Sequence, residues 1–443
     1  MGFESTGEMY DSLKGAVKEG GEVIDEAALR GEAIDAMVRG AVFGGEEVSG
    51  EARSLIKAAA GSLGIFPASI QGLYEAMGSG EVSGFTVPAI NIRGLTYDTA
   101  RAVFRAAMSN DSGAFIFEIA KSEIGYTGQS PAEYSAAILA AAVKEGFRGP
   151  VFIQGDHFQI NAKNSAEDGD KEVGAIKALV KEAIEADFLN IDIDASTVVD
   201  LSKPTVKDQQ EPNFTITAAL TAFIRENEPD GVTVSVGGEI GEVGGKNSTE
   251  DELRAFMDGF LDTLDKKLKG ISKISIQTGT SHGGVVMPDG SIAKVSVDFD
   301  IIEKLSKVSR EAYGLAGVVQ HGASTLPDDA FHLFVEKSAA EVHLATGFQN
   351  MVYDSPAFPV ELRDEVYNYL KDNFPDEMKE GQTEEQFIYK TRKKGFGPFK
   401  EKFWNLDAAR KDIISGELEE RFDQLFKKLN CGNTVGHVRK WVG

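Results

Sequence analysis

The 443-residue chain has only six histidines, and three of them lie beside glycines, in the segments Gly-Asp-His, Ser-His-Gly and His-Gly-Ala. They are His157, His282 and His321, and each follows a short β-branched or aliphatic run that predicts a strand. Three imidazoles with one open coordination position form a catalytic zinc-type arrangement, although iron, cobalt and nickel also accept imidazole. The three histidines therefore predict a divalent ion, with zinc (Zn2+) as the first choice.

Carboxylates stand next to the same predicted strand ends. Asp156 directly precedes His157, which suits a proton-transfer role close to the ion. Asp192 and Glu239 follow two other runs, where a carboxylate can orient a ligating imidazole or ligate the ion itself. The remaining histidines are assigned other roles: His332 and His437 fall in predicted helices, and His343 is near the end of the last predicted strand.

Glycine-rich turns after two of the later strands predict an anion site. Such turns expose backbone N–H groups, and barrels often bind phosphate after their seventh and eighth strands. The predicted donors are Gly283, Gly322, Ser324 and Thr346. No dinucleotide fingerprint, P-loop or Cys-x-x-Cys pattern is present. The combination with the histidines favours a phosphorylated substrate.

Eight strand-like runs alternate with longer amphipathic segments in the middle of the chain. The runs are 85–91, 114–119, 151–155, 188–192, 232–237, 273–278, 315–320 and 341–345. Helices are expected over 97–109, 131–145, 171–186, 216–227, 250–267 and 298–312. Alternation of eight strands with helices predicts an α/β fold, the closed parallel (β/α)8 TIM barrel, whose active site lies at the carboxyl ends of the strands.

The ends of the chain differ from this pattern and suggest helical extensions. Residues 1–80 are expected to be helical, with helices over 27–42 and 54–77 that are broken by Gly44, Gly45 and Gly50. The domain boundaries expected are 1–80 for an N-terminal helical extension, 81–373 for the barrel and 374–443 for a C-terminal helical extension. The basic and aromatic stretch 390–404 is expected to pack against the barrel or a second subunit.

Composition excludes several classes of protein. The 46 basic and 70 acidic residues give a net charge of −24, so neither nucleic acid nor an anionic membrane is an expected partner. The single cysteine, Cys431, cannot form an internal disulfide, which fits a reducing cytoplasm. The first residues contain no apolar signal-peptide core. We therefore expect a cytoplasmic protein.

Seven segments in order resemble the class II, metal-dependent fructose-bisphosphate aldolases and their tagatose-bisphosphate relatives. They are VPAIN, GDH, NIDIDAST, GGEIGEVGG, GTSHGG, HGAS and HLATGF. Each segment alone is weakly specific, but their order along the predicted strands from about residue 85 to 350 makes a strong signal. The terminal extensions have no counterpart in this resemblance.

The resemblance implies roles for these residues. His157, His282 and His321 would bind the ion, Asp156 would shuttle a hydroxyl proton, and the four donors of the glycine-rich turns would hold a phosphate. The implied reaction is reversible cleavage of a ketose bisphosphate, most simply fructose 1,6-bisphosphate to dihydroxyacetone phosphate and glyceraldehyde 3-phosphate. A monovalent cation near the phosphate and a homo-oligomeric state are also implied. Tagatose 1,6-bisphosphate as the substrate, or a non-catalytic aldolase-like subunit, are the alternatives.

The chain departs from the family pattern at three places. Lys246-Asn247 stands where the family has one or two glutamates, one of which removes the carbon-bound proton. Glu242 is the preferred substitute, with Glu250 and Asp251 as further candidates. The family's serine after the second strand falls on Ala120 and its asparagine in the last loop falls on His343.

A Schiff-base aldolase is the rival enzyme class. It needs a buried lysine whose pKa is lowered. Lys273 is the candidate, but its position at the beginning of the sixth predicted strand puts it away from the predicted site.

Overall fold

The computed structural model describes residues 3–241, 246–279, 287 and 297–442. Eight parallel strands form a closed barrel in the order β4-β3-β2-β9-β8-β7-β6-β5, and pairing of β4 with β5 closes it. The bounds are β2 (Val87–Asn91), β3 (Ile116–Ala120), β4 (Gly149–Gln159), β5 (Asn190–Asp194), β6 (Ser235–Glu239), β7 (Lys273–Ile276), β8 (Val318–Gln320) and β9 (Glu341–Leu344). The (β/α)8 barrel with helical extensions that the sequence predicts is confirmed.

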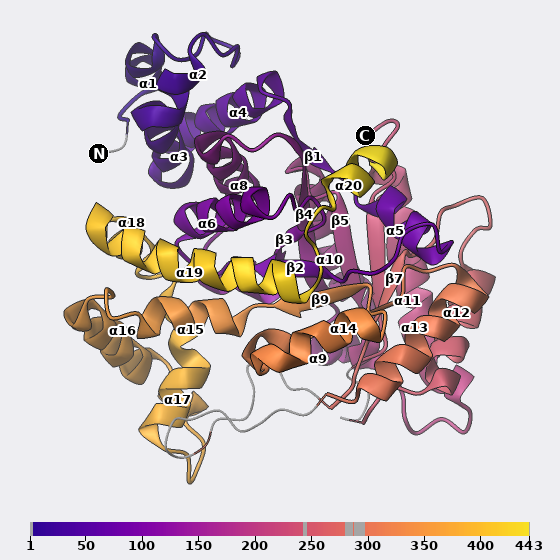
Figure 1. The fold of residues 1–443 in the computed structure, drawn as a ribbon. Helices are drawn as coiled ribbons and strands as arrows, with labels where there is room; N and C mark the ends of the chain where they lie inside the picture. The colour runs from indigo at the N-terminus through magenta and orange to yellow at the C-terminus, as the bar shows by residue number, and fades with distance from the viewer. Residues whose placement is uncertain (1–2, 242–245, 280–286, 288–296, 443) are drawn as a thin grey trace.

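Helices surround the barrel and bury one face of each strand (Figure 1). They include α6 (Thr96–Ser109), α8 (Pro131–Glu145), α10 (Gly169–Glu185), α11 (Val206–Asn227), α12 (Glu250–Thr263), α13 (Phe299–Tyr313), α14 (Phe331–Glu336) and α15 (Thr346–Asp354). Local sequence sets their ends. Ser130 accepts a hydrogen bond from Glu133 N at the start of α8, and Gly146 ends that helix at a φ of 77°.

All residues of β2, β3, β5 and β6 are buried, because helices cover the outer face and packed side chains fill the interior. Strand β5 ends at Asp194, two residues later than the sequence predicts. Since side chains alternate along a strand, Asp192 and Asp194 point to the same side of β5. Asp194 is the last residue of the strand and lies closer to the site at its carboxyl end.

The expectation of an entirely helical segment 1–80 is wrong at one place. Helices α1 (Thr6–Leu13), α3 (Ile34–Phe43), α4 (Glu46–Ser62) and α5 (Gln71–Gly78) occur there, but the short strand β1 (Ile65–Ala68) separates α4 from α5. It pairs in parallel with residues 149–152 of β4. The pairing of β4 with β5 begins only at Gln154, so the backbone groups of these earlier residues are available to β1. The Asn190 side chain completes this edge by bonding Ile70 N at 2.9 Å and Ala68 O at 3.1 Å.

The prediction that Gly50 breaks a helix is also wrong. Gly50 lies inside α4, and its neighbours favour the helix. Gly44, in an extended conformation at the end of α3, and Gly45, which caps α4, do separate two helices as predicted.

The C-terminal segment packs tightly on the barrel. After α16 (Val360–Asn373), it contains α17 (Glu384–Thr391), α18 (Lys400–Trp404), α19 (Ala408–Lys428) and α20 (Val435–Trp441). Helix α19 lies along α6, as Figure 1 shows, and Thr86 N donates to Leu429 O at 3.0 Å. One hydrophobic core runs from Met9 to Val438 through all three segments. In the described part of the chain, no helix is long and apolar enough to cross a bilayer.

Candidate active site

A cavity of about 390 Å³ lies at the carboxyl ends of the strands. Its lining includes six residues that the sequence places in the site: Asp156, His157, His321, Gly322, Ser324 and Thr346. Three further predicted site residues, Glu242, His282 and Gly283, lie outside the described residues. These six residues therefore meet at one cavity, whereas Asp192 and Glu239, which the sequence also places in the site, are not among its lining residues.

An irregularity in β4 aims Asp156 and His157 at this cavity. The pairing of β4 with β5 shifts register between Gly155 and Phe158, and His157 has a φ of 42°, which is uncommon for a residue with a Cβ. Such a bulge lets two consecutive residues oppose one on the partner strand and redirects their side chains. It explains how neighbours in sequence both face the site.

Asp194 fixes the orientation of the His157 ring. His157 Nδ1 lies 3.2 Å from Asp194 Oδ2, and Asp194 Oδ1 accepts from Ser196 Oγ at 2.7 Å. With Nδ1–H donating to Asp194, Nε2 is the nitrogen that can ligate an ion, the arrangement common around metal-binding histidines. Burial opposes the charged ring, but the carboxylates of Asp156 and Asp194 raise the pKa of His157 well above its ordinary value.

His321 and Glu239 complete a group that can hold an ion. The ring centroids of His157 and His321 are 4.2 Å apart, and His321 Nε2 lies 3.5 Å from Glu239 Oε2. Ligand atoms of His157, Glu239 and His321 all lie within 4.8 Å of one another. Glu239 Oε1 accepts from Gly241 N at 2.7 Å, which leaves Oε2 directed at the histidine.

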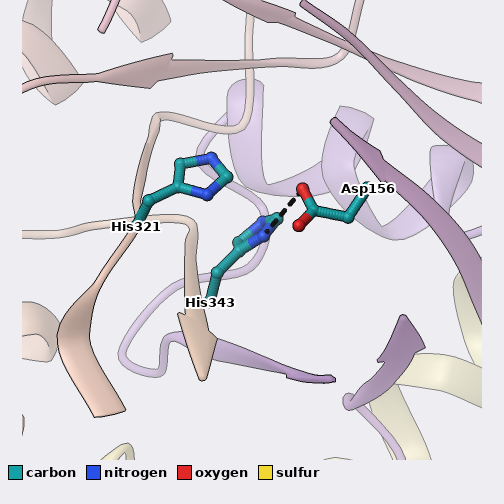
Figure 2. A group of neighbouring side chains, drawn as sticks. All are labelled: Asp156, His321 and His343. Atoms are coloured by element: carbon teal, nitrogen blue, oxygen red, sulfur yellow. Dashed lines mark ion pairs between the residues drawn. The ribbon is translucent and has the colours of Figure 1, made fainter. Parts of the chain in front are cut away.

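A second group contains Asp156, His321 and His343, and Figure 2 shows His343 forming an ion pair with Asp156. Both nitrogens of His343 face carboxylates: Nδ1 is 3.0 Å from Glu118 and 3.3 Å from Asp156, and Nε2 is 2.6 Å from Glu341. Burial opposes its charge, but Glu118 and Asp156 raise the pKa of His343 well above its ordinary value. His343 thus holds Asp156 in place through this ion pair, and its ligand atom lies within 4.8 Å of those of Asp156 and His321.

Asp156 is an ionised carboxylate in this arrangement. Burial acts against ionisation, but His157 and His343 hold the pKa of Asp156 well below its ordinary value. Asp156 is only 5% exposed, and its Oδ1 lies 3.3 Å from His343 Nδ1 and 4.0 Å from His157 Nε2. A buried, ionised carboxylate at the cavity wall can accept a proton from a substrate hydroxyl.

Below the histidines, a polar network crosses the barrel interior. Lys273 Nζ lies 2.6 Å from Glu341, 2.9 Å from Asp192 and 2.7 Å from Gln154 Oε1. Asp192 thus pairs with the lysine, and its distance to His343 Nε2 is 3.8 Å. Burial opposes the charge of the lysine, but Asp192 and Glu341 raise the pKa of Lys273, so it stays an ammonium ion and is a poor Schiff-base nucleophile.

We expect Lys273→Met to lower the free energy of unfolding by about 3–5 kcal/mol, because it leaves Glu341 and Asp192 buried without their cation. Urea unfolding followed by circular dichroism measures this. Lys269→Met is the matched control, since that exposed lysine pairs with Glu75 at the surface. Equal stabilities of the two variants would contradict the structural role of Lys273.

The charges of the site fit a divalent ion. Seven carboxylates are at least nine-tenths buried in or under it: Glu118, Glu123, Asp156, Asp192, Asp194, Glu239 and Glu341. The described lysines and arginines of the site are fewer: Lys273 in the barrel interior, and Arg93, Lys121 and Lys393 in the cavity wall. Imidazole nitrogens and carboxylate oxygens are ligands for first-row divalent metals, and such an ion would offset the excess negative charge. The residues present therefore fit the predicted metal.

Three of the predicted phosphate donors, Gly322, Ser324 and Thr346, line the same cavity. Gly322 has a φ of 71°, a conformation that favours glycine, and follows His321 directly. Ser324 Oγ accepts from Gly347 N at 3.0 Å, which joins the loops after β8 and β9. A Cβ at Gly347 would lie 2.5 Å from Ser324 O, so this close approach requires glycine. Thr346 begins α15, whose amino-terminal dipole favours an anion.

The candidates for the missing glutamate differ in position. Glu250 ion-pairs with Arg254 at 2.9 Å and Lys304 at 3.2 Å on the surface, and Asp251 is exposed in the same helix turn. Neither lines the cavity. Glu242, the preferred candidate, lies outside the described residues, so it stays a prediction.

Comparisons with known proteins agree with this architecture. A family model described as fructose-bisphosphate aldolase class-II matches residues 73–397. The structure is similar to a fructuronate-tagaturonate epimerase from Cohnella laeviribosi, with 11% identity, 86% of each chain covered and a TM-score of 0.61. It is also similar to a probable tagatose 6 phosphate kinase from Sinorhizobium meliloti, with 16% identity, coverage of 80% of this chain and 93% of that chain, and a TM-score of 0.51. A comparison with curated protein sequences gave no match.

A parallel barrel with histidines, carboxylates and glycine-rich turns at its strand ends fits a barrel enzyme whose site can hold a metal ion. The family match covers most of the chain, whereas the structural likenesses at this low identity support only the fold. The chain belongs to the class II fructose-bisphosphate aldolase family and is a carbon–carbon lyase of that class.

Sequence reasoning missed several residues of the site. Asp194 takes the orienting position beside His157, and a period of two from Asp192 was the signal that could have found it. Glu118 and Glu341 are polar residues inside predicted barrel strands, which indicates a buried network but not its partners. Arg93 and Lys393 also line the cavity, and they come from the loop after β2 and from the C-terminal segment.

Proposed function

We propose that the protein catalyses reversible, metal-dependent aldol cleavage of a ketose bisphosphate, with fructose 1,6-bisphosphate as the first candidate. The observation that carries this proposal is the β4 bulge, which puts an ionised Asp156 beside a pair of potential metal-ligating histidines at one cavity. The products would be dihydroxyacetone phosphate and glyceraldehyde 3-phosphate. A divalent ion, zinc as first choice, would be held by His157 and His321 together with Glu239 or His282.

The ion, when bound, would act as a Lewis acid on the substrate carbonyl. The chain's own groups perform the proton transfers. Asp156 accepts the proton from the hydroxyl on carbon 4, the electron pair of that O–H bond forms the aldehyde carbonyl, and the pair of the C3–C4 bond passes to the ketone fragment. Protonation of that fragment on carbon needs a second acid, for which Glu242 is the candidate. His343 keeps Asp156 in position through its ion pair.

The loop residues Gly322, Ser324 and Thr346 would hold a phosphate of the substrate, with Gly283 as a further donor. Charge-assisted hydrogen bonds from backbone N–H groups suit this role. A monovalent cation near that phosphate, a homo-oligomeric state and a cytoplasmic location belong to the same proposal.

The test compares release of dihydroxyacetone phosphate from fructose 1,6-bisphosphate and tagatose 1,6-bisphosphate by the purified protein. We expect release from at least one of them, and the ratio of the two kcat/KM values identifies the preferred configuration at carbon 4. A metal-loaded, folded protein that cleaves neither bisphosphate would contradict the proposed substrate class.

A further inference from the structure

Lys393 of the C-terminal segment reaches the active-site cavity of the barrel. It lies in the 3-10 turn Arg392–Gly395 and lines the cavity with Arg93 and Thr346. The turn packs against α7 (Lys121–Thr127), and the Lys393 ammonium group lies 5.6 Å from the centre of the Tyr126 ring. The C-terminal segment, close to the end of the family match at residue 397, thus contributes a basic residue to the site.

The neighbouring cations are already paired, but Lys393 is not. Arg93 bonds Glu123 at 2.7 Å and Gln349 at 2.9 Å, and Lys121 pairs with Glu172 at 3.0 Å. Among the described residues, no carboxylate lies within 4 Å of the Lys393 ammonium group and no side-chain hydrogen bond is made by it. Burial, together with the nearby Arg93 guanidinium, lowers the pKa of Lys393. Lys393 is therefore a basic group of the cavity wall whose charge has no carboxylate partner among the described residues.

The position of this charge matches the predicted anion site. Arg93 Nη1 lies 3.4 Å from Thr346 Oγ1, so the Arg93 side chain adjoins the amino-terminal end of α15. Thr346 and Ser324 line the same cavity as Lys393. An anion bound by the loops after β8 and β9 would thus have the two basic side chains beside it.

We propose that Lys393, supported by Arg93, is a substrate-binding residue that pairs with an anionic group of the substrate, either a phosphate ester or a carboxylate. The inference rests on the proposed function only in assigning this cavity to the substrate. It makes the C-terminal segment part of the active site of its own chain. An ion pair that is partly shielded from water in this way contributes more to binding than one at the surface.

The test measures binding of two small probes, glycerol 3-phosphate and glycerate, to the metal-loaded full-length protein by titration calorimetry. Lys393→Met is expected to weaken binding of the preferred probe about 10- to 100-fold, as for loss of one hydrogen bond to a charged group. Lys394→Met is the matched control, because that adjacent lysine pairs with Glu377. It should leave binding within about twofold of the unsubstituted protein. Lys393→Arg, which keeps the charge, should retain most of the binding.

The outcomes separate this inference from the proposed reaction. Preference for glycerol 3-phosphate identifies a phosphate, and preference for glycerate identifies a carboxylate; both support the anion site, while the second contradicts a bisphosphate substrate. Loss of binding in Lys393→Met supports the inference even if the protein cleaves no bisphosphate. Unchanged binding in Lys393→Met, equal losses in both Met variants, or the same loss in Lys393→Arg would overturn it. Thermal unfolding of each variant shows whether a loss comes from misfolding.

Discussion

Asp156→Asn is expected to lower kcat for aldol cleavage about 10²- to 10⁴-fold, the usual contribution of a positioned general base. The amide keeps the size of the carboxylate but cannot accept the hydroxyl proton. Because Asp156 is not in the group formed by His157, Glu239 and His321, the variant should retain its bound metal. Steady-state kinetics and metal analysis of the same preparation measure both quantities.

Asp230→Asn is the control for this substitution, since Asp230 is exposed and remote from the cavity. Its kcat should equal that of the unsubstituted protein. An Asp156→Asn variant with full activity would remove Asp156 from the mechanism. Loss of metal in that variant would instead make Asp156 a ligand, as in the second group of Figure 2.

His321→Ala should weaken metal binding more than about 100-fold and abolish measurable cleavage, because it removes one imidazole from the proposed ion site. Removing a group that only orients a ligand typically costs about 10- to 100-fold in metal affinity. The loss of metal affinity in Asp194→Ala should be in this smaller range, because Asp194 contacts His157 Nδ1 and is not a member of the group that would hold the ion. Competition with a coloured chelator gives both affinities.

His332→Ala is the control histidine variant. Its side chain is 48% exposed and lies 3.7 Å from Glu336 on the surface of α14. Metal affinity should be unchanged in this variant. If His321→Ala bound metal as tightly as His332→Ala, the assignment of the ion group would be wrong.

The barrel could be predicted from sequence because each strand is a short, fully buried run between amphipathic helices. The eight predicted runs overlap β2 to β9, and errors of one to four residues are confined to their ends. One such error concerns β5, because its predicted end at residue 192 placed Asp194 in the following loop rather than on the strand with Asp192. Strand β1 was missed because four residues between two helices carry little periodicity.

The sequence could predict site residues only where they directly follow the end of a predicted strand. Asp156, His157 and His321 satisfied that rule, and the structure brings them together. The partners of His343 could not be predicted, because Glu118 and Glu341 sit inside strands and meet only when the barrel closes. Lys393 could not be predicted either, since the C-terminal segment reaches the cavity by packing that sequence periodicity does not reveal.

Titration of metal into chelator-treated protein, with the cleavage rate recorded at each addition, tests the central claim most directly. The account predicts negligible activity without metal and a rate that rises in proportion to bound zinc, or another first-row divalent ion, until one ion is bound per chain. Full activity in the metal-free protein, or trapping of substrate on Lys273 by borohydride, would contradict it.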